Sequence, residues 1–152
     1  MIGTLFALLL TAAQAAQLPL PVLPPDEQAW VVLIETRGGF TGRGTGSVSA
    51  TSAGEVLCTS AGVCPARLVP DAQQSIGRLV AGLPMPADVP SRPPAVGPSI
   101  CNDCVTTTMT VQRRDRDGAR TLQFRWDEST LGTIPGDVLQ LHAAVVALPR
   151  LR

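Results

Sequence analysis

The fold is decided by the stretch VTTTMTVQRRDRDGARTLQFRW, residues 105–126. Apolar and polar residues alternate through both of its halves. The apolar members on one side are Val105, Met109, Val111, Leu122, Phe124 and Trp126. A period of two residues is typical of a strand with one buried face. The turn sequence Asp115-Arg116-Asp117-Gly118 separates the halves, so the stretch predicts a β-hairpin.

Two further strands are predicted upstream of this hairpin. Residues 30–36 (WVVLIET) are rich in β-branched and aromatic residues, which is typical of a buried strand. Residues 44–53 alternate more weakly. Their apolar positions, from Val48 on to Val56, indicate a second strand that returns antiparallel to the first.

The period changes to that of a helix in two places. Between Asp71 and Leu83, apolar residues recur at i, i+3, i+4 and i+7, with Asp71 placed as an N-cap and Pro84 beyond the end. Residues 84–99 hold six prolines and predict an irregular loop. Residues 134–148 carry a second stripe, with Pro135 in the first turn. The apolar positions of this stripe are Val138, Leu141, Val145 and Leu148.

These elements predict an α+β fold in the order ββαββα. A four-stranded antiparallel sheet with both helices packed on one face would bury all the apolar stripes together. The residues expected to be deeply buried are Leu33, Val111, Phe124, Ile76, Leu79, Leu141 and Val145.

The N-terminus predicts export. Residues 2–11 are almost entirely apolar and are followed by Ala13-Gln14-Ala15, which is typical of a signal peptide and its cleavage site. No Lys or Arg precedes the apolar run, and a buried helix or a membrane anchor are the alternatives. The run is shorter than the roughly 20 residues of a membrane span. We therefore expect a signal peptide over residues 1–15, a Pro-rich extended segment over 16–28 and one domain over 29–152, secreted or periplasmic and without stable membrane insertion.

Four cysteines in an exported chain predict disulfides. Cys58 and Cys64 lie six residues apart, and Cys101 and Cys104 form a Cys-x-x-Cys pair. Local pairing is favoured over the two crossed pairings. A four-cysteine zinc site is the alternative, but the first spacing is wide for a zinc knuckle. A redox-active pair is disfavoured because a strand, not a helix, follows Cys104.

The charge balance disfavours a nucleic-acid partner. The chain has 12 basic and 12 acidic residues, and its formal net charge is zero. Phosphate contacts would require a basic surface. Arg113, Arg114 and Arg116 form the one basic cluster, but aspartates interleave with them, which is typical of a solvated hairpin tip.

No catalytic set is apparent in the sequence. The single histidine, His142, follows a stripe position of the last predicted helix and is expected to be a packing or surface residue. The carboxylate pairs Asp26-Glu27 and Asp127-Glu128 are expected to be solvated. We therefore expect a protein that is not an enzyme and uses neither cofactor nor metal.

The segment Thr36-Arg37-Gly38-Gly39-Phe40-Thr41-Gly42 ends the first predicted strand with an aromatic residue between glycines. It resembles the motif found there in the emfourin-type inhibitors of protealysin, a thermolysin-like zinc metalloprotease. The later elements agree in order, so the resemblance spans about residues 31–148. The two cysteine pairs and the long proline loop depart from the pattern. So does the stretch Asp103 to Thr107, where an Asp-x-Phe-x-Tyr-like sequence is expected.

The resemblance implies a secreted protein-binding module that inhibits a thermolysin-like metalloprotease. The partner-contact residues that it implies are Arg37, Gly38, Gly39, Phe40, Thr41 and Gly42. From the residues alone, Phe40 has two interpretations: a core residue of a wide turn, or part of a loop that enters a partner's cleft. The alternative function is a structural or interaction protein of the cell envelope without inhibitory activity.

Overall fold

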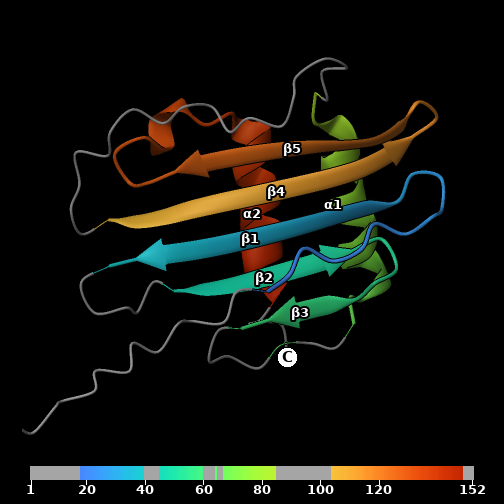
Figure 1. Cartoon of the computed structure of the whole chain (residues 1–152), viewed down its shortest axis with the longest axis horizontal. Coiled ribbons are helices and arrows are strands. Elements are labelled where there is room, and N and C mark those ends of the chain that lie inside the picture. Colours follow the sequence, from blue (N-terminus) through green and yellow to red (C-terminus); the bar gives the residue numbers. More distant parts are fainter. Residues whose placement is uncertain (1–17, 40–44, 60–63, 65–66, 85–103, 149–152) are drawn as a thin grey trace, which may run out of the picture.

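A computed structural model describes residues 18–39, 45–59, 64, 67–84 and 104–148. Within them, five strands form one antiparallel sheet in the order β3-β2-β1-β4-β5 (Figure 1). The strands are β1 (Trp30–Gly38), β2 (Gly46–Thr51), β3 (Val56–Cys58), β4 (Val105–Asp115) and β5 (Gly118–Trp126). Between β5 and the last helix the chain forms one short 3-10 turn, Leu131–Thr133.

The predicted α+β class, with an antiparallel sheet and two helices, is confirmed, but the count of four strands and the order ββαββα are wrong. The described order is βββαββα, because the chain turns at Gly54 (φ 81°) and Val56 pairs back with Ala50. The sequence interpretation joined Val56 to the preceding strand. β3 has only three residues, which is too few for a period of two to be recognised.

The hairpin forms where the alternation predicts it. β4 and β5 pair from Thr107 with Trp126 to Asp115 with Gly118, and Gly118 has a φ of 124° that favours glycine. The Asp117 backbone N–H donates to the Asp115 side chain at 3.0 Å, which closes the turn.

The helices are α1 (Pro70–Gly82) and α2 (Gly136–Val146), and both lie behind the sheet in Figure 1. The predicted N-cap role of Asp71 is wrong. Val69 occupies the cap position without a side-chain hydrogen bond, and Pro70 takes the first turn, where its missing N–H is not needed. Pro135 likewise precedes α2 as its cap residue and is not part of the first turn.

A single apolar core lies between the sheet and the helices. Val111, Ile76, Leu141 and Val145 are buried in it, as expected. Phe124 and Leu79 are only partly buried, since Phe124 stands on the edge strand β5. Leu33 is buried, but it points to the opposite face of the sheet from Val32 and Ile34, which belong to the core.

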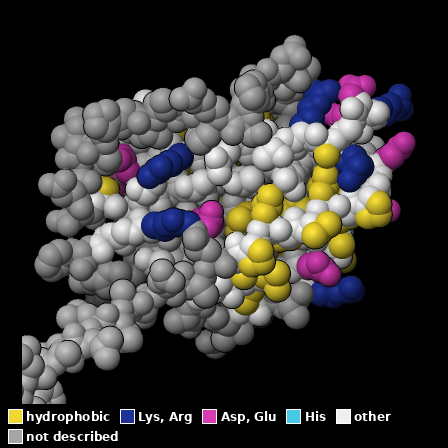
Figure 2. All heavy atoms as spheres, in the orientation of Figure 1, with side chains coloured by type: hydrophobic (Ala, Val, Ile, Leu, Met, Phe, Trp, Pro, Cys, Tyr) yellow, Lys and Arg dark blue, Asp and Glu magenta, His cyan; other side chains and the backbone are white. Residues whose placement is uncertain are grey.

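The face opposite the helices is partly covered by the Pro-rich segment before β1, residues 18–28, which we call the strap. Val31 and Leu33 point to this face and are 0% and 4% exposed. Figure 1 shows the strap crossing in front of β2, and Figure 2 shows hydrophobic side chains gathered in the same area. The Arg114 Nε donates to the Pro24 carbonyl at 3.3 Å and ties the strap to β4.

Candidate partner-binding face

The end of β1 holds the first part of the glycine motif. Gly38 and Gly39 have φ values of 100° and 83°, a region that residues with a Cβ rarely adopt. A Cβ at Gly38 would also lie 2.7 Å from the Cys104 carbonyl oxygen. Two constraints, the backbone conformation and the close approach of β4, therefore require glycine at this position.

A groove of about 420 Å³ lies beside this strand end, on the face of the sheet opposite the helices. Its lining includes Glu35, Arg37, Gly38, Thr106, Thr108 and Arg125, together with Cys104 and Gln123. The strand register builds it, because Glu35 pairs with Thr108 and Thr108 pairs with Arg125, so the three side chains form one row across the sheet.

The groove is polar and has more basic than acidic groups. Arg37 lies 3.6 Å from Glu35, and the two side chains are 62% and 19% exposed. Arg125 is exposed and forms no ion pair within the described ranges. The guanidinium groups and the threonine hydroxyls offer hydrogen bonds to the carbonyls or carboxylates of a partner.

The remaining motif residues, Phe40, Thr41 and Gly42, lie outside the described residues. Of the six residues implied as partner contacts, the structure therefore places Arg37, Gly38 and Gly39, all three at the exit from the sheet. The two interpretations of Phe40 stay predictions.

Among the described cysteines, Cys58 ends β3 and Cys104 directly precedes β4. Cys58 and Cys64 form a disulfide with a Cα–Cα distance of 5.9 Å, which is one of the local pairs favoured from the sequence. Cys104 is also disulfide-bonded and borders the groove, whereas Cys101 lies outside the described residues. The Cys104 disulfide therefore adds a covalent constraint next to the close contact between Cys104 and Gly38.

Asp127 and His142, both considered in the sequence analysis, make contacts that stabilise the fold. Asp127 is 3% exposed, not solvated as expected, and its Oδ1 accepts from the backbone N–H groups of Ser129 and Thr130 at 2.9 and 3.0 Å. His142 packs edge-to-face against Trp126 with ring centroids 5.2 Å apart. Its buried Nε2 has no hydrogen-bond partner among the described atoms, and burial lowers the pKa of the imidazole.

The sequence interpretation missed the residues of the groove that lie outside the motif. The alternation puts Arg125 on a polar position of its strand, whereas Glu35 falls within a stretch predicted to be a buried strand. Nothing local to either stretch says that β1 and β4 are neighbours. The alternation in residues 105–126 is the one signal that could have placed Thr106, Thr108 and Arg125 on a shared face.

No family model, curated protein or solved structure matches this chain. In the described ranges, neither helix has the length and hydrophobicity to cross a membrane. The same residues contain no group of three or more His, Cys, Asp or Glu side chains that could hold a metal ion.

Proposed function

We propose that this chain is an exported protein-binding module that inhibits a thermolysin-like zinc metalloprotease and has no catalytic activity of its own. The observation that carries the proposal is the motif at the end of β1. Gly38 is held against Cys104, and the chain leaves the sheet next to a polar groove. The resemblance of residues 36–42 to the emfourin-type motif supplies the class of partner.

The geometry supports binding through a segment whose base on β1 is fixed before the partner arrives. The β1–β4 ladder extends to Gly38, which pairs with Val105, so the base of this segment is fixed by the sheet. A fixed base lowers the conformational entropy that is lost on binding. Glycines at the exit from the strand also let a partner's surface approach the backbone closely.

The groove supports the same proposal through its charge. Arg37 and Arg125 stand on the same face as the exit of the loop and can donate to carbonyl or carboxylate groups at the rim of a protease cleft. The only histidine, in contrast, lies on α2 on the other side of the sheet, away from the groove.

The test is an inhibition titration of residues 16–152 against the thermolysin-like protease of the source organism. We expect reversible inhibition that does not depend on added metal. The Arg37→Ala and Arg125→Ala variants should each weaken inhibition by about tenfold, since a charged hydrogen bond contributes about 1.5 kcal/mol. Arg116→Ala, at the opposite end of the β4–β5 hairpin, is the matched control and should inhibit normally.

Phe40→Ala separates the two interpretations of that residue. Loss of inhibition with an unchanged circular dichroism spectrum would support a contact role. Inhibition that falls only in proportion to the folded fraction would support a core role. An absence of inhibition by the unaltered protein at micromolar excess would contradict the proposed activity.

A second candidate, an interaction protein of the cell envelope without inhibitory activity, is favoured by one observation. Leu57 is 49% exposed on the face that the strap crosses, and Leu20 and Val22 of the strap are 37% and 90% exposed. Exposed apolar patches of this kind are typical of binding surfaces. Binding of the metalloprotease without inhibition, or of an envelope protein alone, would support this candidate.

A further inference from the structure

A second concave site lies at the other end of the β1–β4 ladder. The motif end of that ladder pairs Gly38 with Val105, whereas this end pairs Trp30 with Arg113. A cleft of about 610 Å³ opens here between the hairpin tip, α1 and the turn that precedes β1. The residues that matter for its chemistry are Gln28, Trp30, Arg78, Arg113, Arg114 and Arg116. Its volume is in the range of small-molecule sites in proteins.

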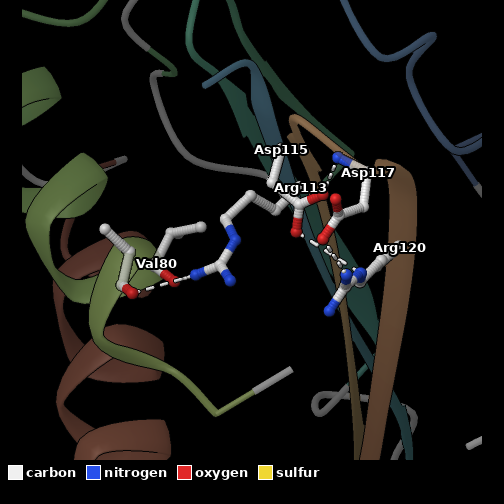
Figure 3. A network of polar contacts seen from close by, with 6 residues as sticks. Val80, Arg113, Asp115, Asp117 and Arg120 are labelled. Carbon is white, nitrogen blue, oxygen red and sulfur yellow. Dashed lines mark hydrogen bonds and ion pairs between the residues drawn. The ribbon is translucent and has the colours of Figure 1, made fainter. Parts of the chain in front are cut away.

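Two of the four arginines of this cleft hold elements together: Arg114 ties the strap to β4 through the Pro24 carbonyl, and Arg113 links the hairpin to α1. The Arg113 Nη1 donates to the carbonyls of Val80 and Ala81 at 3.1 and 2.9 Å, as Figure 3 shows. These carbonyls belong to the last turn of α1, where helix carbonyls lack partners within the helix. Arg113 therefore fastens α1 to the hairpin and fixes the width of the cleft.

The carboxylates of the hairpin tip are paired with a different residue. Arg120 lies 3.3 Å from Asp115 and 2.9 Å from Asp117, and both contacts are visible in Figure 3. Arg120 offsets only one of these two negative charges. The lining of the cleft therefore sets four arginines against the carboxylates of Glu27 and Asp115 and keeps a net positive charge. Within the described residues, Arg78, Arg114 and Arg116 form no ion pair.

Two further groups border the cleft and indicate a site shaped for a ligand. Trp30 is 6% exposed and borders the cleft, and its indole packs against Gly77, where a Cβ would lie 3.1 Å from Nε1. Gln28 has a φ of 65° in the turn that the Ala29 N–H closes on the Asp26 carbonyl at 3.2 Å. A side chain in this region costs stability, and such strain is concentrated at functional sites.

We propose that this cleft binds an oxyanion, a phosphate or polycarboxylate group carried by a small ligand. Arg78, Arg114 and Arg116 supply charged donors, and Gln28 and the Trp30 indole supply neutral donors. Guanidinium groups match the planar geometry of carboxylates and the tetrahedral edges of phosphates with paired hydrogen bonds. The site is separate from the proposed partner-binding face and does not depend on it.

The two tryptophans make the proposal directly measurable. Trp30 borders the cleft, whereas Trp126 lies on β5 against His142 and serves as an internal reference. The experiment follows both indole N–H signals by NMR in ¹⁵N-labelled protein during titration with inorganic phosphate and, separately, with citrate. Sodium chloride at equal ionic strength is the control.

We expect the Trp30 signal to shift and saturate with phosphate, citrate or both, while the Trp126 signal stays in place. The anion that saturates the signal at the lower concentration identifies the chemistry of the ligand. The double variant Arg78→Gln/Arg116→Gln should bind at least about tenfold more weakly, because two charged donors are lost. Arg125→Gln, which removes a charge from the other groove, should bind normally.

Three results would overturn the proposal. The first is that the Trp30 signal does not saturate with either anion. The second is that both indole signals shift equally, and by as much as they do with sodium chloride. The third is that the folded double variant binds the anion as tightly as the unaltered protein. Arg113 is left intact in all variants because it holds α1.

Discussion

At the scale of single residues, Gly38 and His142 are the two positions whose surroundings give testable predictions about stability. Gly38 combines a φ of 100° with an approach of 2.7 Å between a potential Cβ and the Cys104 carbonyl oxygen. Either condition alone would disfavour a residue with a Cβ at this position. Together they explain why the strand that leads to the motif ends in glycine.

Gly38→Ala should lower the free energy of unfolding by about 1–3 kcal/mol, since a strained backbone conformation and a contact with β4 are both imposed. Urea denaturation measures this change. Gly82→Ala is the matched control. Gly82 ends α1 with a negative φ and no atom within 4 Å of a potential Cβ, so alanine should be neutral or slightly stabilising there. Equal effects of the two substitutions would contradict the account of Gly38.

His142 predicts a pH dependence of stability. Burial lowers the pKa of its imidazole from 6.5, and its buried Nε2 has no partner among the described residues, so the folded state favours the neutral form. The unfolded chain therefore binds the proton more readily. The contribution of His142 is full above pH 6.5 and is lost as the pH falls toward the folded pKa.

Chemical denaturation between pH 7.5 and 5 should show this loss, and His142→Phe should reduce it while keeping an aromatic ring against Trp126. If both proteins lose stability equally over this range, carboxylates are the cause and the role given to His142 is wrong.

At the scale of elements, the helices depend on tertiary contacts at their ends. The α1 N-cap, Val69, forms no side-chain hydrogen bond, and no basic residue stands in the last turn of the helix. The positive charge that this C-terminus favours comes from Arg113 on β4.

Arg113→Met should keep most of the side-chain packing but remove these hydrogen bonds, and lower the free energy of unfolding by about 1 kcal/mol. In this variant, the rate of backbone hydrogen exchange should rise most in the last turn of α1. Arg116→Met, in the exposed hairpin turn, should change stability by no more than about 0.5 kcal/mol. Unchanged hydrogen exchange in α1 of the Arg113→Met variant would contradict the proposed link between Arg113 and the helix.

The disulfide between Cys58 and Cys64 constrains the end of the short strand β3. A loop of this length predicts about 2 kcal/mol of stabilisation through the restricted unfolded chain. The Cys58→Ala/Cys64→Ala variant should lose this amount in thermal denaturation. Non-reducing intact-mass measurement of the unaltered protein should show four hydrogens fewer than the thiol form. Four free thiols would contradict the assignment.

At the scale of the whole molecule, the sheet is covered on both faces, by the helices on one and in part by the strap on the other. This arrangement explains why β1 has five consecutive buried residues at its start and no clear alternation there. Val31 and Leu33 are buried on the face that the strap crosses, and Val32 and Ile34 belong to the core.

Removal of residues 16–25 should expose Val31 and Leu33 and lower the free energy of unfolding by about 2–4 kcal/mol. A rise in the fluorescence of a dye that binds apolar surface should accompany it. Val22→Ser, at a position that is 90% exposed, is the control and should change neither quantity. Unchanged stability after truncation would mean that the strap does not cover these residues.

The elements whose signal is local can be predicted from the amino-acid sequence alone. The hairpin is predicted by the alternation of apolar and polar residues and by an Asp-Gly turn. The helices are predicted by apolar stripes that include Ile76, Leu141 and Val145. Both signals depend only on residues that are close along the chain. The tertiary structure alone shows that β1 lies between β2 and β4, that β3 joins the sheet, and that the strap crosses the face to which Val31 and Leu33 point. These features depend on contacts between remote residues. The groove and the basic cleft lie at the two ends of the β1–β4 ladder, and no local pattern predicts that Glu35 meets Thr108 or that Trp30 meets Arg113.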